Sequence, residues 1–406
     1  MWGSLAVLSA LLYWQLTSRL SRLLSTLVLK SNDVKLYRDT GEAVLRGELP
    51  YQDFFIEYPP GSVPAFLPPA LFSSNLRDFG ELFGAEMAIV LVCSLVLVAL
   101  TARKLYGEWA WIVPASAFTL GAILLQPIAV SRFDPLVSLA LAIAVLCTAL
   151  GGRYRILAFA SLGVGTAIKL IPVLATVPLV AVREQNELSS RWLRRTGAGV
   201  LAFLATLGAF FVPSYLLGGE RFRESFAYHA DRGLQLESLA SAVLLKLGWV
   251  QDTVFRYGAM EVEGRGAELL SSLSLPITAA LVLITAAVMY RDHRTHGFVA
   301  AKFPRYAAAF ILAFMIGSKV LSPQYMLWLL PLIPLSAAGL WAVSVSGIFL
   351  MACWTTTQIF PKYYGNLIEF DPAAINLLLV RDLLLVVLWI TLLVLPADTT
   401  PEKKPA

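Results

Sequence analysis

The chain has 406 residues, of which 58% are hydrophobic and 15% are charged, and its formal net charge is +5. This composition excludes an ordinary soluble domain and is typical of a protein that crosses a membrane many times. The three cysteines lie inside apolar segments and only three histidines occur, so we expect neither a disulfide framework nor a cysteine or histidine metal site. We therefore predict no metal and no cofactor.

Long apolar runs recur along the chain, and about 20 residues of helix are needed to cross the hydrocarbon core. The runs are continuous rather than alternating, which indicates helices and not strands. We predict one all-α polytopic domain over residues 1–406, with about twelve transmembrane or re-entrant helices. The first is expected to be a membrane helix and not a cleaved signal. The expected segments are 2–18, 82–101, 109–125, 136–150, 156–182 (two limbs), 197–217, 271–289, 306–320, 326–340, 341–360 and 374–395.

The longest polar stretch follows the first apolar segment, in a predicted first outer loop over residues 30–80. A helical apolar stripe begins after Asp33 and ends at Gly47 and Pro50, before a proline-rich half. Asp33 is therefore either a helix cap or a carboxylate at the water–lipid interface, where it can meet a lipid-bound substrate and an aqueous acceptor. The six carboxylates of the loop are Asp33, Asp39, Glu42, Glu48, Asp53 and Glu57.

Residues 156–182 are apolar but are broken by Lys169 and Pro172, and arginines flank both ends. If both flanks are cytoplasmic, the segment is a re-entrant helix pair with Lys169 at its apex; a single tilted helix is the alternative. A lysine inside a membrane is costly and usually faces a cavity or a partner. Phosphate binding and pairing with an internal carboxylate both remain open for Lys169.

The short loops on one side are almost purely basic, which places that side in the cytoplasm. We predict a multi-pass protein of the plasma membrane. The first outer loop and a large outer loop over residues 218–268 then face the extracytoplasmic side, and the tail 396–406 faces the cytoplasm.

Several motifs resemble those of family 87 glycosyltransferases, which are polytopic enzymes of the GT-C class. In the first outer loop the resemblance rests on Asp33, Tyr37, Gly47, Pro50-Tyr51, Phe55 and Tyr58-Pro59-Pro60. It continues in order with RFDPLVSLALAI (132–143), GVGTAIKLIP (163–172), RGLQLES (232–238) and SPQYMLWLLPL (322–332). The resemblance covers most of the chain and implies a GT-C-like helix bundle with a structured first extracytoplasmic loop.

The resemblance also implies a reaction. Such enzymes take a sugar from a polyprenyl-phosphate carrier on the outer leaflet and pass it to an acceptor. An acidic residue of the first outer loop is their catalytic base, and that position falls on Asp33. Family kinship implies a mannose-like or arabinose-like sugar, a lipid-linked or cell-envelope glycan or glycolipid as acceptor, and inversion at the anomeric carbon.

A leaving polyprenyl phosphate needs nearby cations. The candidates are Lys169, Lys319, Arg232 and His229. For Lys319 the alternative is snorkelling to the interface, and for His229 it is a plain loop position.

Other polar side chains are candidates for binding the sugar or the acceptor. Asp134, beside Arg132, either caps the following helix, holds a sugar hydroxyl or is the second acidic group of the site. Tyr58 either stacks on a sugar or packs the proline-rich loop. The full set predicted to bind substrate is Tyr37, Tyr58, Arg132, Asp134, Lys169, His229, Arg232, Lys319, Gln324 and Tyr325.

The expected partners are the donor, the acceptor and membrane lipids, and no nucleic acid. A transporter or lipid flippase is the main alternative. It predicts symmetric repeats and mid-membrane ionisable groups in both halves, neither of which is clear in the sequence. A polymerase or ligase of lipid-linked glycans is a third possibility.

Overall fold

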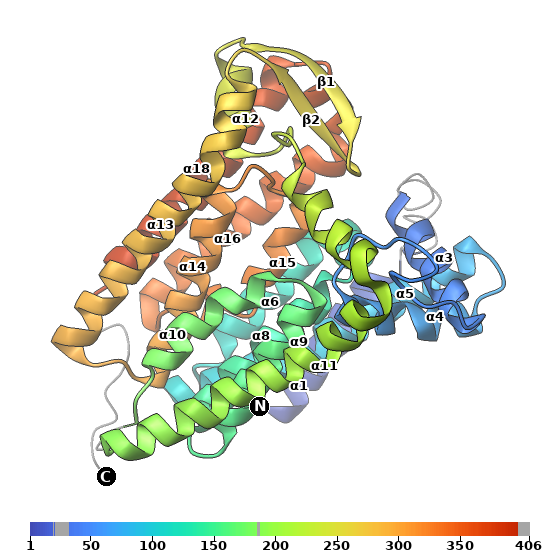
Figure 1. Ribbon diagram of the computed structural model, residues 1–406. Helices are drawn as coiled ribbons and strands as arrows, with labels where there is room; N and C mark the ends of the chain where they lie inside the picture. Colours follow the sequence, from blue (N-terminus) through green and yellow to red (C-terminus); the bar gives the residue numbers. More distant parts are fainter. Residues whose placement is uncertain (19, 21–31, 185–186, 397–406) are drawn as a thin grey trace.

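Figure 1 shows a computed structural model of the chain, which describes residues 1–18, 20, 32–184 and 187–396. Most of the described chain is helical, and six helices are long and apolar enough to cross a membrane. They are α5 (Leu76–Tyr106), α11 (Ser189–Ala230), α13 (Ala267–His296), η4 with α14 (Ala300–Gly317), α16 with η7 (Gly339–Lys362) and α18 (Pro372–Val394). The prediction of an all-α polytopic membrane fold is confirmed.

Shorter apolar helices complete the bundle. They are α1 (Trp2–Thr17), α6 (Ile112–Leu124), α8 (Asp134–Leu150), α9 (Tyr154–Ile168) and η3 with α10 (Ile171–Ala181). α8 packs between α5 and α9, and α14 is buried along nearly its whole length. α9 and α11 approach so closely that a Cβ added to Gly199 would lie 2.2 Å from the ring of Phe159, so the contact requires glycine at this position. Small residues are what allow such close helix packing in lipid.

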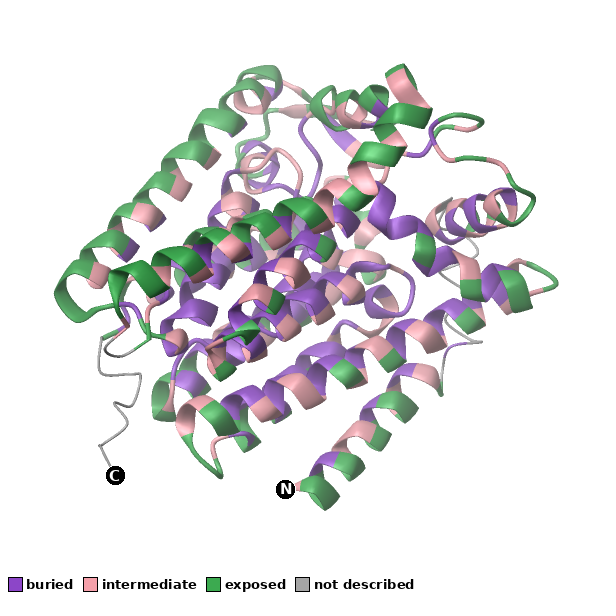
Figure 2. Ribbon diagram, turned by 60° about the horizontal axis from the view of Figure 1, so that its bottom comes forward, coloured by how far each residue is buried: buried purple, intermediate pink, exposed green. Residues whose placement is uncertain are grey.

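Two long helices lie at the periphery and expose most of their surface. Figure 2 shows this exposure along α11 and α13, and the exposed side chains are largely apolar. Examples are Leu201, Leu216, Leu275 and Leu283. Apolar surface of this extent fits contact with lipid.

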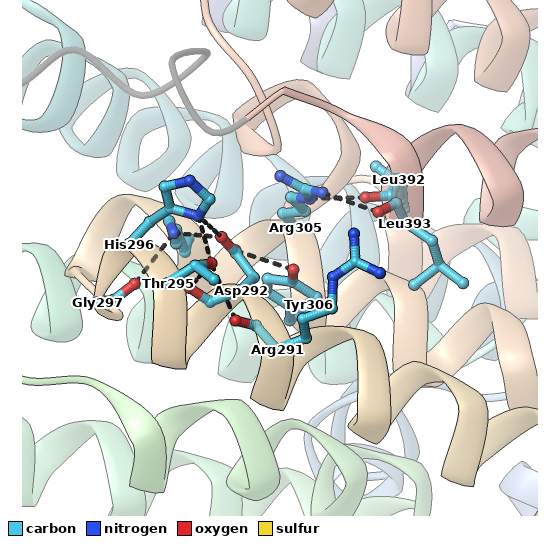
Figure 3. Close-up of polar contacts among 10 residues, drawn as sticks. Arg291, Asp292, Thr295, His296, Gly297, Arg305, Tyr306, Leu392 and Leu393 are labelled. Carbon is cyan, nitrogen blue, oxygen red and sulfur yellow. Dashed lines mark hydrogen bonds and ion pairs between the residues drawn. The ribbon is translucent and has the colours of Figure 1, made fainter.

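A polar network joins three helices at one end of the bundle (Figure 3). The Asp292 carboxylate of α13 accepts hydrogen bonds from Lys302 Nζ at 2.7 Å and from the Tyr306 hydroxyl at 2.9 Å. Arg305 Nε donates to the carbonyl oxygen of Leu392 at 2.6 Å, in the last turn of α18. A cation there also complements the negative end of the helix dipole. We call this end of the bundle, where Arg291, Lys302 and Arg305 lie, the basic end.

The first loop folds compactly at the opposite end. Its helix α3 (Asn32–Leu45) is confirmed, and two short helices follow, η2 (Pro60–Phe66) and α4 (Leu67–Phe72). Tyr37 is buried and stacks on Phe66 with ring centroids 4.6 Å apart. Gly41 must be a glycine, because an added Cβ would lie 2.5 Å from the carbonyl oxygen of Phe66.

The segment 156–182 turns back on itself. α9 ends at Ile168, Lys169 is extended with φ −156° and ψ 132°, and η3 begins two residues later with Pro172 near its start. Arg155 Nη2 donates to the carbonyl oxygens of Leu179 and Val180, both at 3.1 Å. The first turn of α9 therefore lies beside the end of α10, and Lys169 lies at the far end of the two limbs.

One expected helix is broken. Residues 326–340 contain α15 (Met326–Leu329) and η6 (Ile333–Leu335) instead of a single helix. Pro331 and Pro334 explain the break, since proline has no amide hydrogen to donate and clashes with the preceding turn.

The expected large outer loop over 218–268 contains more regular structure than a polar loop. α11 continues to Ala230 through a kink at Gly219, and α12 (Leu239–Lys246) follows. Strands β1 (Val250–Arg256) and β2 (Ala259–Gly264) then form an antiparallel hairpin. Its two turn residues, Tyr257 and Gly258, both have positive φ, as a tight hairpin turn requires. The predicted tail lies outside the described residues apart from Pro396.

The first loop is seated directly on the break in the segment 156–182. An added Cβ on Gly61 would lie 2.6 Å from the carbonyl carbon of Ala167 and 2.8 Å from the Ile168 nitrogen. We predict that Gly61→Ala separates the two backbones and destabilises the fold by about 1–3 kcal/mol, as overpacking usually does. Thermal unfolding in detergent measures this as a lower midpoint. Gly197→Ala is the control, because nothing lies within 4 Å of its added Cβ. Equal midpoints for both variants would contradict the predicted seating.

Candidate active site

A cavity of about 440 Å³ opens where the first loop meets segments from the second half of the chain. Its walls come from the first loop, the start of α8, the break after α9, the end of α11, and the turn before η5 (Pro323–Tyr325). The predicted site residues that line it are Asp33, Tyr58, Arg132, Lys169, His229, Arg232, Lys319, Gln324 and Tyr325. Segments far apart in sequence therefore share one cavity.

Asp33 lies in the first turn of α3, with its carboxylate at the cavity wall. Arg132 Nη2 is 2.8 Å from one carboxylate oxygen, and the Tyr58 hydroxyl donates to the other at 3.2 Å. The Asp33 side chain is 32% exposed, whereas that of Arg132 is 11% exposed. Arg132 and Tyr58 thus orient the carboxylate and leave part of it open to the cavity.

Tyr37 does not line this cavity. It is buried behind Tyr58, with their ring centroids 5.8 Å apart, and Phe133 lies against its edge at 5.6 Å. The prediction of direct substrate contact does not fit this position. Tyr37 instead supports the ring of Tyr58, because aromatic packing fixes both side chains.

Asp134 and Lys169 form a buried ion pair beside the cavity. Lys169 Nζ lies 2.8 Å from Asp134 Oδ1, and Trp328 Nε1 donates to the same oxygen at 2.7 Å. Of the two alternatives for Lys169, the structure shows pairing with an internal carboxylate. Asp134 is fully buried and does not line the cavity, so direct contact with a sugar does not fit its position. Its side chain also does not cap α8.

Two other cations line the cavity without a carboxylate partner within the described part of the chain. Arg232 donates to the carbonyl oxygen of Tyr257, and Lys319 Nζ donates to that of Ala230 at 2.7 Å. Desolvation lowers the pKa of Lys319, because partial burial disfavours its charged form. An anion in the cavity would offset that penalty. Their charges are therefore available to a ligand, unlike that of Lys169.

The remaining predicted residues complete the walls. His229 Nε2 lies 2.9 Å from the carbonyl oxygen of Glu57, which ties the end of α11 to the first loop. The ring of Tyr325 stacks on that of Trp328 with centroids 4.0 Å apart. Gln324 lines the cavity next to it. The cavity wall at η5 and α15 is therefore partly aromatic.

Sequence reasoning did not single out Glu237, which also lines the cavity. The signal was present in the run Leu234-Gln235-Leu236-Glu237, where apolar and polar residues alternate as in an extended strand. Its place beside the cavity depends on long-range contacts that alternation alone does not reveal. Among the described residues, no group of three or more His, Cys, Asp or Glu side chains is arranged to hold a metal ion.

Removing Lys169 from the Asp134–Lys169 pair is expected to cost more stability than removing the charge of Asp134. Lys169→Met leaves a fully buried carboxylate without its cation and is expected to destabilise the fold by about 3–5 kcal/mol. Asp134→Asn costs less, because Lys169 is 18% exposed and reaches the cavity. The double variant should lose less than the sum of the two single losses, as thermal unfolding can show. Additive losses would contradict the energetic coupling of the pair.

The comparisons with known proteins agree with this architecture. The family model of glycosyltransferase family 87 matches residues 55–323. GPI mannosyltransferase 1 of Eremothecium gossypii is 26% identical over 213 residues, which are 52% of this chain and 49% of that protein. The chain therefore spans about half the length of this curated relative.

A solved structure has a similar fold. The crystal structure of ArnT from Cupriavidus metallidurans in the apo state matches with a TM-score of 0.51 and 12% sequence identity, over 96% of this chain and 76% of that one. This likeness supports the GT-C fold alone. The family match includes Arg132, Lys169, Arg232 and Lys319 but begins after Asp33. With more than half of its length matched, the chain belongs to glycosyltransferase family 87.

Proposed function

We propose that this membrane glycosyltransferase moves a sugar from a polyprenyl-phosphate carrier to a glycan or glycolipid acceptor, with Asp33 as the catalytic base. One observation carries the proposal: a single cavity contains the accessible carboxylate of Asp33 together with the unpaired cations Arg232 and Lys319. A base and a phosphate site are the two groups that such a transfer requires.

The proposed reaction is one displacement at the anomeric carbon. The acceptor oxygen forms the new C–O bond while the bond between that carbon and the phosphate oxygen breaks. The acceptor proton passes to the Asp33 carboxylate, and the electron pair of the broken bond leaves with the polyprenyl phosphate. Attack from the face opposite the leaving group inverts the anomeric configuration.

The leaving phosphate gains negative charge during this step. Arg232 and Lys319 are placed to stabilise it electrostatically, because among the described residues neither forms an ion pair with a carboxylate. Apolar side chains line the same cavity and offer a wall for the first units of the lipid chain. They are Leu170, Ile171, Phe226 and Phe314.

The proposed location is the plasma membrane, with the cavity on the extracytoplasmic side. Arginines gather at the basic end of the bundle, away from the first loop, and positively charged ends stay in the cytoplasm. Among them are Arg183, Arg191, Arg194, Arg291 and Arg305. The similarity to a GPI mannosyltransferase favours a mannose-like sugar, and an arabinose-like sugar is the alternative.

The transporter alternative is weaker than it was from sequence alone. A transporter would need ionisable groups near the middle of the membrane, and Lys169 is the candidate for such a group. Its charge is paired with Asp134 at 2.8 Å. A paired charge gives no reason to assume an ion pathway.

Asp33→Asn tests the role of the base. An amide of the same shape cannot accept the acceptor proton, so transfer should fall by about 10²–10⁴-fold, the usual range for general base catalysis. The assay uses purified protein in liposomes with a panel of polyprenyl-phosphate sugars. Asp39→Asn is the matched control, since Asp39 is an exposed carboxylate of the same helix α3 and lies outside the cavity. Equal transfer by wild type and Asp33→Asn would remove Asp33 from this role.

Lys319→Met and Arg232→Met test the phosphate site. Each is expected to raise the KM for the donor by about tenfold or more, because a charge-assisted contact to phosphate is lost. The KM for the acceptor should change little. Lys246→Met serves as a control, since Lys246 of α12 donates a hydrogen bond to Asn376 of α18 and lies outside this cavity. An unchanged donor KM in both cavity variants would place the phosphate elsewhere.

A further inference from the structure

Gln235 pairs with Glu261 of β2, and a turn follows in which the Ser238 amide donates to the Gln235 carbonyl oxygen at 3.0 Å. The amide of Leu236 donates to the Met260 carbonyl oxygen, and the amide of Val262 donates to that of Leu234, both at 2.9 Å. Leu234 and Leu236 pack into an apolar cluster under the hairpin, while Gln235 and Glu237 both line the cavity.

Gln235 is held in one orientation. Its Oε1 atom accepts a hydrogen bond from the Leu321 amide at 2.9 Å, so its Nε2 group is the donor side. That group lies 3.2 Å from Glu237 Oε2. One of the two carboxylate oxygens of Glu237 therefore has a fixed protein partner.

The backbone of Glu237 is fixed as well. Arg381 Nη2 donates to the Glu237 carbonyl oxygen at 2.6 Å, and Arg381 Nε pairs with Asp382 at the same distance. Nε and Nη2 of the guanidinium are thus engaged with Asp382 and a main-chain oxygen, while Nη1 is buried and has no hydrogen-bond partner among the described residues. Within the described residues the guanidinium makes no ion pair with the Glu237 carboxylate.

The second carboxylate oxygen, Oε1, is buried and has no hydrogen-bond partner among the described residues. The whole residue is only 2% exposed. Burial raises the pKa of Glu237 to about 7, so near neutrality its carboxyl group exists in both protonation states. A buried polar atom without a partner is costly unless a ligand satisfies it. The cavity is the place from which such a ligand would come.

The position of Glu237 indicates which group would reach it. Gln235 N donates to the Lys319 carbonyl oxygen at 2.9 Å, so this stretch lies beside the backbone of Lys319, and it lines the same cavity as the cations Arg232 and Lys319. A phosphate bound by Arg232 and Lys319 would be repelled by a carboxylate, whereas the sugar attached to that phosphate carries neutral hydroxyl groups. The aromatic rings of Phe360 and Tyr364 line the same cavity.

We propose that Glu237 hydrogen-bonds a hydroxyl group of the sugar that is transferred and thereby selects the donor. This inference rests on the proposed function. A rigid polar group that must be satisfied by a substrate hydroxyl rejects an analogue that lacks it more strongly than an apolar wall can. Glu237 is therefore a specificity-determining residue, separate from the base Asp33 on the first loop.

The test combines two substitutions with donor analogues. The donors are the polyprenyl-phosphate sugar that wild type uses and its monodeoxy analogues, each lacking one ring hydroxyl. Glu237→Leu removes the polar group with little change in volume, and Glu237→Gln keeps the shape in case the first variant folds poorly. Glu263→Gln is the control, an exposed carboxylate on β2 that pairs with Arg256 outside the cavity.

Wild type should use one deoxy donor at least about a hundredfold less well than the parent, measured as kcat/KM. Glu237→Leu should lose most of this discrimination, because its kcat/KM falls for the parent donor and hardly changes for that one analogue. Polyprenyl phosphate without a sugar should stabilise wild type and Glu237→Leu equally against heat. Glu263→Gln should behave as wild type.

Each outcome decides one question. An equal loss for every donor, or no loss at all, would overturn the role of Glu237 while leaving the proposed function intact. Weaker stabilisation of Glu237→Leu by the sugar-free lipid would also overturn it, because that result places the phosphate at Glu237. If wild type transfers sugar from none of the polyprenyl phosphates, the proposed function itself fails.

Discussion

Two ion pairs, built from one short turn, hold the site together. Arg132 pairs with Asp33 of the first loop, and two residues later Asp134 pairs with Lys169 at the break after α9. Three segments that are distant in sequence therefore meet at the start of α8. Separating a buried ion pair leaves a charge without compensation, which is costly. These contacts therefore fix the relative position of the segments more strictly than apolar packing alone.

The same pairing divides the cations of the cavity into two groups. Arg132 and Lys169 are neutralised by carboxylates and serve to orient other side chains. Arg232 and Lys319 donate hydrogen bonds to main-chain carbonyl oxygens and, among the described residues, form no ion pair with a carboxylate, so their charges are available to a ligand. A count of basic residues in the sequence cannot make this distinction, because it depends on which carboxylate each cation meets after folding.

Much of the fold was predictable from apolar segments, and most of the site from motifs. Asp33, Tyr58, Arg132 and Lys169 were singled out from sequence, and all line the cavity. The direct roles expected for Tyr37 and Asp134 were not supported, because both side chains are buried behind the wall. Motifs place residues along the chain but do not show which way a side chain points.

Other features depend on contacts that no local pattern contains. The β-hairpin follows an apolar helix in a region that composition alone describes as a polar loop. Glu237 reaches the cavity in a turn that directly follows the pairing of Gln235 with β2 and with the backbone of Lys319. Pro331 and Pro334 are local signals for a break within 326–340, but the hydrophobicity of the segment favours a single helix, which is what we expected.

The central claim is that the donor phosphate and the base share this one cavity. A structure of the protein in lipid nanodiscs with bound polyprenyl phosphate tests it most directly. The account predicts the phosphate group between Arg232 and Lys319, on the same cavity as the Asp33 carboxylate. A phosphate bound at the basic end of the bundle, or anywhere outside the cavity, would contradict it.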